Sequence, residues 1–334
     1  MATTGYDDYI SRTDGSAYLL QDEYSKEIIE ALPTQSFCLK MMRGLPTLNA
    51  KTLKIPMANS FPTAYFVDEV AGARGAANIK KTTDMSWSGV TLYVEEAAVI
   101  VPVPESVIED MASANFDLWG MVKPRLVEAL GKLIDAAILF DSAGSLAPAA
   151  WPDGIVTQAI AASNAVDVSS DVGAGKTFED IAGAIVADNG LLSLVEQDGF
   201  ICNGAMGAIS MMGKLRGLRD ANGQFLFMND MKAPNDYRIA GIPMTFPNNG
   251  AFNPATALLV VGDWSQAVYG IRRDITWKLA TEASITAADG TLVYNLFQDD
   301  MVALRVTMRM GWVLPNPKNM VNSSTQFPFA VLKP

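Results

Sequence analysis

The amino-acid sequence predicts an α+β fold, and three patterns predict it. Apolar residues recur at three- and four-residue steps through residues 116–140, which is typical of a long amphipathic helix. In residues 302–312, large apolar side chains alternate with Ala, Arg, Thr, Arg and Gly, which is typical of a half-buried strand. Between these two segments, short helical and strand-like patterns follow one another without a fixed repeat.

The composition sets limits on the partners of the chain. Hydrophobic residues make up 49% of the 334 residues and charged residues only 18%, so some apolar surface is expected to be buried between subunits. The chain has 25 Lys and Arg against 36 Asp and Glu, a net charge of −11. Such a surface repels nucleic acid, which argues against a protein that reads a nucleotide sequence.

The residue types present argue against an enzyme. The sequence contains no His, which removes Ser-His-Asp and Cys-His nucleophiles and every His-bearing zinc site. The carboxylate pairs Glu95-Glu96 and Asp299-Asp300 lie in or beside predicted strands, where neighbouring side chains point to opposite faces. Cys38 and Cys202 are far apart and fit no metal or redox motif. We therefore expect no catalytic residues, no metal and no cofactor; an enzyme that uses acids and Lys from distant segments is kept as an alternative.

One short segment resembles the end of a phosphate-binding loop. It is Gly173-Ala174-Gly175-Lys176-Thr177, but Ser170 stands where a complete loop needs its first Gly. Thr177 and Asp180 instead form a helix-capping pattern ahead of an apolar helical face. The segment is therefore interpreted as the start of a helix near residues 178–187.

The first hundred residues combine polar extensions with two strands. Residues 1 to about 35 are polar, which predicts an extended arm with one short amphipathic stretch at 24–32. A half-buried strand at 53–57 and a longer apolar partner at 90–103 flank a polar, Gly-rich excursion. Long loops of this kind are usually functional or disordered. The charged residues expected to contact other subunits lie in this excursion: Asp68, Glu69, Arg74, Lys80 and Lys81.

The rest of the chain is predicted to be a mixture of helices and short strands. A short helix through Met111 precedes the long helix, which Pro124 should bend or begin. A Gly-, Ala- and Pro-rich break spans residues 142–154. The further expected elements are helices at 178–187 and 205–218 and strands at 225–228, 239–244 and 257–261. The residues expected to be critical for the core are Leu126, Leu130, Leu133, Trp264 and Trp312.

Several segments, taken in order, resemble one known family. They are Val101 to Asp110 before the long helix, Asp135 to Leu139 with the later Pro152 to Ile155, Leu215 to Leu226, Ile239 to Met244, Val261 to Ile271 with its Gly-Asp-Trp-Ser sequence, and Gln298 to Trp312. Their order and spacing resemble the major capsid proteins of tailed bacteriophages, which have the Hong Kong 97-type fold. The resemblance covers nearly the whole chain.

The resemblance implies a division of the chain and a function. The implied parts are an N-terminal arm and lead-in (1–50), an extended loop hairpin (51–103), a peripheral domain with a spine helix (104–155), an axial domain (156–261) and return strands of the peripheral domain (262–334). The implied function is structural: subunits self-assemble, as hexamers and pentamers, into the icosahedral shell that encloses the phage genome. Arm and loop would lie over neighbouring subunits.

Further implications concern partners and location. The expected partners are other copies of the chain, a scaffold, a portal and possibly decoration proteins, with packaged DNA contacted only non-specifically and no membrane. A separate scaffold is expected because the sequence starts with only a short arm. The expected location is the virion, and the host cytoplasm during assembly. Some relatives form a Lys-Asn crosslink, but no Asn or acid partner for Lys80 or Lys81 can be identified. The alternative function is an encapsulin-like nanocompartment shell.

Overall fold

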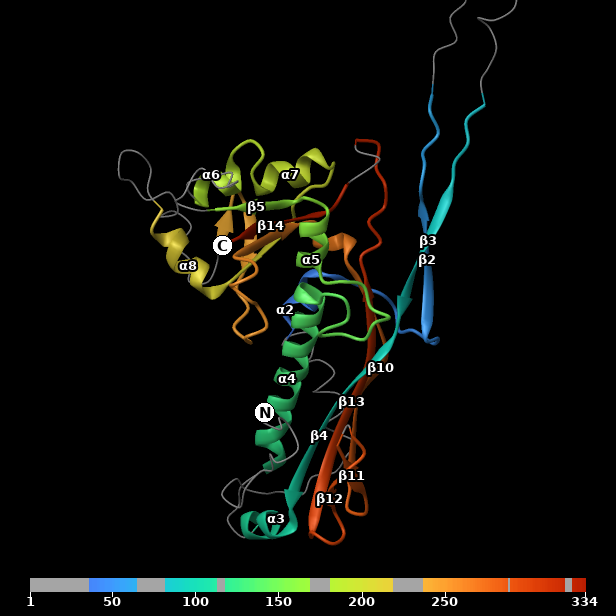
Figure 1. Ribbon diagram of the computed structural model, residues 1–334, viewed down its shortest axis with the longest axis vertical. Coiled ribbons are helices and arrows are strands. Elements are labelled where there is room, and N and C mark those ends of the chain that lie inside the picture. Colours follow the sequence, from blue (N-terminus) through green and yellow to red (C-terminus); the bar gives the residue numbers. More distant parts are fainter. Residues whose placement is uncertain are drawn as a thin grey trace, which may run out of the picture.

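The computed structural model describes residues 36–64, 82–112, 118–168, 181–218, 237–287, 289–321 and 326–334. Figure 1 shows an elongated molecule built from three parts. A long helix lies along a narrow four-stranded sheet, a six-stranded sheet with short helices lies at one end, and a two-stranded hairpin projects away from the body. The mixture of helix and sheet confirms the α+β prediction.

The four-stranded sheet, called the long sheet below, has the strand order β1-β10-β13-β4. Its strands are β1 (Arg43–Gly44), β10 (Val268–Ala280), β13 (Met301–Val313) and β4 (Glu95–Pro104). β13 is antiparallel to both β10 and β4. The predicted alternation is present in the middle of β13. Leu304 and Val306 are buried in the core, whereas Arg305 between them is exposed.

The predicted long helix is α4 (Leu118–Phe140), which follows the short helix α3 (Glu105–Ala112) and contains Pro124. Leu126 and Leu130 are buried, as expected. Leu133 is 46% exposed, so its assignment to the core was wrong. At about 100° per residue, Leu133 lies at the edge of the stripe that Leu130 and Ile134 occupy. Its side chain lines a shallow, mostly apolar hollow together with Leu146 and Trp151.

This difference predicts unequal effects of two identical substitutions in α4. Leu130→Ala should lower the free energy of unfolding by about 2–5 kcal/mol, because it leaves a cavity at a fully buried position. Leu133→Ala should cost less than about 1 kcal/mol in the isolated subunit, because half of its side chain is in solvent. Denaturant unfolding of both purified variants checks this, and equal losses would contradict the assignment of α4's faces.

The six-stranded sheet has the order β5-β14-β9-β6-β8-β7. The strands are β5 (Ala165–Asp167), β14 (Phe329–Lys333), β9 (Leu259–Gly262), β6 (Gly204–Gly207), β8 (Ile242–Thr245) and β7 (Arg238–Ile239). Helix α5 (Ile155–Ala161) packs on the face that bears Phe329 and Val331. The opposite face, with Ala330 and Leu332, is covered by α6 (Ile181–Val186), α7 (Leu191–Gln197) and α8 (Ile209–Arg216).

The position of β14 differs from the implied division of the chain. All of residues 262–334 were expected to return to the peripheral part together, and β10 and β13 do lie in one sheet, the long sheet. β14 instead pairs with β5 and β9 inside the six-stranded sheet. Its alternate side chains are apolar on both faces, so it is suited to a position covered by helices on both sides.

Some local predictions also differ from the structure. Residues 205–218 were expected to form one helix, but β6 precedes α8. Gly204 and Gly207 disfavour a helix there, and β6 pairs instead with β8 and β9. Residues 239–244 form two strands joined at Ala240 and Gly241, both with positive φ. Helices α2 (Phe37–Met41) and α7 were not predicted. The expected strand at 225–228 and the first residues of the expected helix at 178–187 lie outside the described residues.

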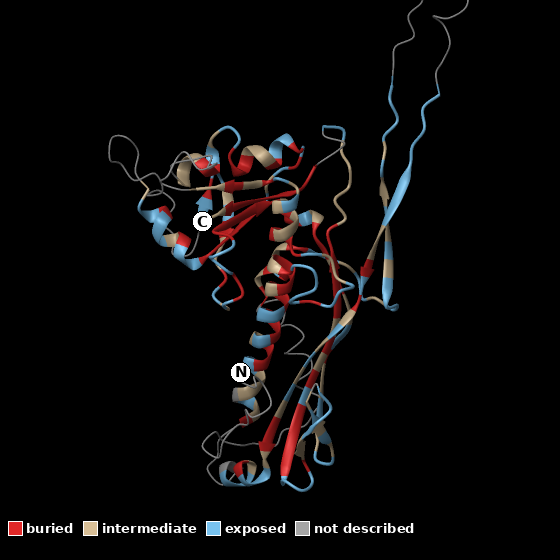
Figure 2. Ribbon diagram, viewed as in Figure 1, coloured by how far each residue is buried: buried red, intermediate tan, exposed pale blue. Residues whose placement is uncertain are grey.

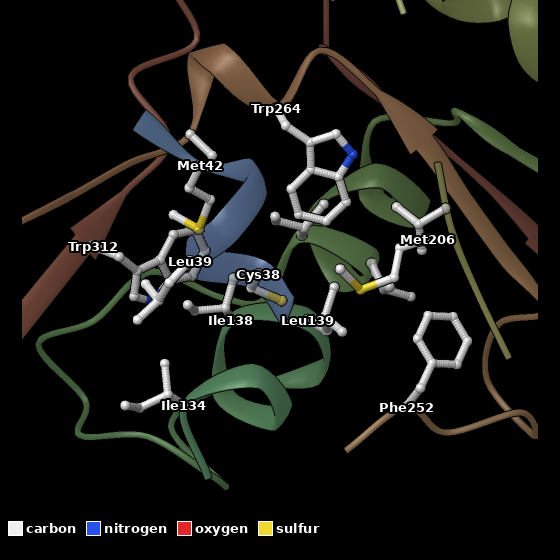
Figure 3. Packing of buried hydrophobic residues seen from close by; sticks show 14 of the residues in the cluster. Cys38, Leu39, Met42, Ile134, Ile138, Leu139, Met206, Phe252, Trp264 and Trp312 are labelled. Carbon is white, nitrogen blue, oxygen red and sulfur yellow. The ribbon is translucent and has the colours of Figure 1, made fainter. Parts of the chain in front are cut away.

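One apolar core joins the parts of the body. Figure 3 shows Trp264 and Trp312 on either side of α2, with Cys38 and Leu39 of α2 between them and Ile138 of α4 beneath. Figure 2 shows the same buried layer running from the long sheet into the six-stranded sheet. Helix α4 and both sheets are therefore packed around a shared interior.

Candidate assembly surfaces

The projecting hairpin consists of β2 (Thr52–Ala58) and β3 (Trp87–Tyr93), paired from Thr52 with Tyr93 to Ala58 with Trp87. The expected strand at 90–103 is thus divided at Val94, where the chain passes from the hairpin into β4 of the long sheet. At the base, Leu92 and Val94 are buried against Val313.

The far part of the hairpin exposes apolar side chains. Trp87 is 68% exposed, Met85 40% and Phe61 36%. Figure 2 shows that burial is confined to the base of this hairpin. A two-stranded hairpin with no layer packed on it is at best marginally stable in water. Exposed apolar side chains that lie together, unlike single ones, mark contact surfaces. These three flank the hydrogen-bonded Ser60 and Ser86, so this part of the hairpin is suited to binding another molecule.

The charged residues expected to contact other subunits lie between β2 and β3 in sequence. Asp68, Glu69, Arg74, Lys80 and Lys81 all lie in residues 65–81, outside the described residues. Their role stays a prediction. The segment Gly173 to Thr177 also lies outside the part of the chain that the structure describes.

The point where residues 1–35 join the body is fixed by a buried carboxylate on α4. Asp135 is fully buried and accepts four hydrogen bonds. Ser36 Oγ (2.6 Å) and the Cys38 amide (3.1 Å) donate to its Oδ1, while the Phe37 amide (3.0 Å) and Asn249 Nδ2 (2.7 Å) donate to its Oδ2. Because three of the donors belong to the first turn of α2 and its N-cap, Asp135 holds α2 against α4. This role of Asp135 was not predicted from the sequence, although a carboxylate within an apolar helical stripe indicates a buried partner.

The Gly-Asp-Trp-Ser segment links the two sheets. Asp263 Oδ1 accepts hydrogen bonds from the Ser265 amide (3.1 Å) and from Asn203 Nδ2 (2.7 Å), which fixes the turn η2 (Trp264–Gln266). Trp264 is 1% exposed, donates from Nε1 to the Gly204 carbonyl (3.2 Å) and packs edge-on against Phe329. The pattern therefore has a structural role: it anchors the start of β10 to the six-stranded sheet.

The described residues show how the carboxylate pairs are used. Glu96 forms an ion pair with Arg309 (2.6 Å) and Glu95 one with Lys51 (3.7 Å). Asp299 Oδ2 accepts from the Asn295 amide (2.9 Å). Within the described segments, no group of three or more His, Cys, Asp or Glu side chains is placed to hold a metal ion. The helices of these segments include none that is long and apolar enough to cross a membrane.

Both cysteines are free thiols. Burial raises the pKa of Cys38 well above its ordinary value, and the neighbouring Asp135 raises it further. Burial, with Glu196 and Asp263, raises the pKa of Cys202 to about 12. Because the thiolate is the reactive form, neither cysteine should react readily near neutral pH.

Comparison with known proteins identifies the family. The model of the phage capsid family matches residues 16–321. The major capsid protein of Staphylococcus phage 80alpha is 26% identical over 305 residues, covering 90% of this chain and 82% of the relative.

Solved structures agree with this match. A chain from Mycobacterium phage Cain is 30% identical with a TM-score of 0.74, covering 98% of this chain and 99% of its own. A chain from Microbacterium phage Oxtober96 is 32% identical with a TM-score of 0.73, covering 90% and 91%. These similarities give no support to the nanocompartment alternative over a phage head. The chain therefore belongs to the phage capsid family, has the Hong Kong 97-type fold of tailed-phage heads and is a major capsid protein, a structural subunit of the icosahedral head shell.

Proposed function

We propose that copies of this subunit form the hexamers and pentamers of the shell, with the β2–β3 hairpin and the N-terminal arm lying over neighbouring subunits. The observation that carries the proposal is the hairpin itself. It projects from the body and leaves Trp87 largely exposed. Among the described residues, no other segment of the same chain packs on its far part. Contact with a neighbour would supply that layer.

The proposal extends to the other partners and to the division of the chain. The negative net charge fits only non-specific contact with packaged DNA. A separate scaffold, a portal and possibly decoration proteins are proposed from the family resemblance, as are assembly in the host cytoplasm and the absence of enzymatic activity. The long sheet with α3 and α4 would be the peripheral domain. The six-stranded sheet, now including β14, would be the axial domain.

Electron microscopy in negative stain, with light scattering, tests the proposal. The chain is expressed alone and together with the products of neighbouring genes, and the particles are counted. Closed shells or rings of hexamer size are expected in at least one condition. A monomer that never assembles in either condition would contradict the proposed role of the hairpin and arm.

Removal of residues 1–30 should separate folding from assembly. The deletion leaves Ser36, α2 and their hydrogen bonds to Asp135 intact, so the subunit should keep its thermal unfolding midpoint within a few degrees. The yield of closed particles should fall strongly, because the contacts of the arm with neighbours are lost. Normal shells from the shortened chain would show that the arm is not needed for assembly.

A further inference from the structure

The outer face of the long sheet, which is the face turned away from α4, carries an unusual arrangement of positive charge. Lys278 on β10 lies directly opposite Arg305 on β13, and Arg273 lies opposite Arg309. Like charges directly opposite each other on neighbouring strands destabilise a sheet. The chain as a whole has a net charge of −11, so this concentration of cations is not a consequence of composition.

Only one carboxylate of the described residues forms an ion pair with this face. Glu96 lies opposite Arg309 and pairs with it. In the described part of the chain, Lys278, Arg305 and Arg273 have no carboxylate within ion-pair distance, and all three are exposed. Together, Arg273, Lys278, Arg305 and Arg309 form a basic ladder.

The basic ladder lies on an uncovered part of the sheet. At the start of β13, the small hairpin of β11 (Ser284–Thr286) and β12 (Leu292–Asn295) packs on Met301 and Ala303 of the same outer face. Beyond that point the face is open. Ile100, which lies opposite Arg305 on β4, is 47% exposed. The open face therefore combines positive charge with an exposed apolar side chain.

A surface of the opposite character lies at the tip of the same subunit. The turn that leads into β13 exposes Asp299 and Asp300 and leaves Phe297 73% exposed. Glu105 joins them, because its amide donates to the Asp300 carbonyl (2.8 Å). This acidic tip, defined as Phe297, Asp299, Asp300 and Glu105, combines negative charge with an exposed aromatic ring.

The two surfaces cannot satisfy each other within one molecule. Asp300 and Arg305 are five residues apart along an extended chain, so their backbones are separated by roughly 17 Å. An ion pair needs about 4 Å between its charged atoms. The acidic tip also lies beyond the β11–β12 hairpin, which covers the intervening part of the face.

From this complementarity we infer that the basic ladder of one subunit binds the acidic tip of a second copy, with Phe297 against Ile100. The inference rests on the proposed function, because it names one of the contacts through which the shell would form. The contact joins two different patches, so repeating it around an axis generates a ring that can close. Protein is favoured over nucleic acid as the occupant for two reasons. The Glu96 carboxylate repels phosphate, and the exposed Ile100 side chain offers a phosphate backbone no favourable contact.

Charge reversal tests the contact. Lys278→Glu combined with Arg305→Glu keeps like charges opposite each other, so the subunit should remain as stable as the wild type. The yield of closed particles should fall about tenfold or more, since each charge would then repel the acidic tip. The matched control is Lys132→Glu with Lys214→Glu, which makes the same change in net charge at two exposed positions away from the ladder and should assemble normally. Adding Asp299→Lys and Glu105→Lys to the ladder variant should restore particles.

A single substitution distinguishes the contact from a role in folding. Lys278→Glu places a carboxylate opposite Arg305, which should raise the unfolding midpoint of the subunit while particle yield falls. A residue needed only for folding would move both quantities in the same direction. That result would overturn the inference, as would a ladder variant that assembles as well as its control.

Crosslinking gives a direct readout. In assembled particles, Ile100→Cys combined with Phe297→Cys should give dimers and larger bands with a short thiol crosslinker, because the inference places these two side chains against each other. Each single variant should stay monomeric, because Cys38 and Cys202 are poorly reactive. Monomer bands alone from assembled double-variant particles would overturn the inference.

Three further outcomes are decisive. Loss of duplex DNA binding in the ladder variant with normal assembly would assign the ladder to nucleic acid and overturn the inference. If wild-type particles form and the reversals have no effect, the inference alone fails. If the wild type never assembles, the proposed function fails and the contact fails with it.

Discussion

Replacing Trp264 with alanine should lower the free energy of unfolding by about 3–5 kcal/mol. The indole is 1% exposed, donates a hydrogen bond to the Gly204 carbonyl and packs edge-on against Phe329 at 5.1 Å between ring centroids. Its removal leaves a cavity between the start of β10 and the six-stranded sheet. Denaturant unfolding of the purified subunit measures the loss, and expression should shift toward insoluble protein.

Trp87→Ala is the matched control for this prediction. It makes the same chemical change at a side chain that is 68% exposed in the single subunit. It should change the stability of the isolated subunit by no more than about 0.5 kcal/mol and act instead on assembly. Equal losses in the two variants would contradict the burial assigned to Trp264.

Replacing Asp135 with alanine should have a comparable effect, a loss of about 3–5 kcal/mol, for a different reason. The substitution leaves four donors without their acceptor: the Ser36 hydroxyl, the Phe37 and Cys38 amides, and Asn249 Nδ2. Each buried donor without a partner costs about 1–3 kcal/mol, although water and rearrangement recover part of this. Thermal or denaturant unfolding measures the change, and proteolysis should become faster near α2.

Two variants bracket the Asp135 prediction. Asp135→Asn keeps the volume but turns an amide N–H2 toward two donors, so its loss should be smaller than that of Asp135→Ala and still clear. Asp167→Ala removes a half-exposed carboxylate that pairs with Lys333 at 3.3 Å, and it should cost about 1 kcal/mol or less. If Asp135→Ala cost no more than Asp167→Ala, the buried carboxylate would not be what holds α2 in place.

The parts of the fold that the sequence predicted are those with strong local periodicity. Helix α4 and strand β13 each repeat one pattern over ten or more residues, so their type, extent and main burial could be predicted. The error at Leu133 came from the edge of the helical stripe, where one residue step decides between core and solvent. Short elements such as α2, of five residues, carry too few periods to be recognised.

Features that depend on distant partners could not be predicted from local patterns. The apolar sequence of β14 indicates a buried strand, but nothing in it names β5 and β9 as its neighbours. The alternation in β13 places Arg305 and Arg309 on one face. Only the register with β10 shows that other cations lie opposite them. The candidate contacts in residues 65–81 stay predictions, because they rest on composition and family resemblance alone.

The position of β14 has a consequence for when a subunit becomes competent to assemble. β14 is the last strand of its sheet in sequence order, yet it lies between β5 and β9, pairing Ala165 with Val331. The sheet therefore cannot close until residues 329–333 have left the ribosome, and pairings so distant in sequence form slowly. Until then, β5 and β9 each lack a neighbour. A chain from which β14 has not yet emerged would thus have an incomplete six-stranded sheet, which would delay its entry into a growing shell.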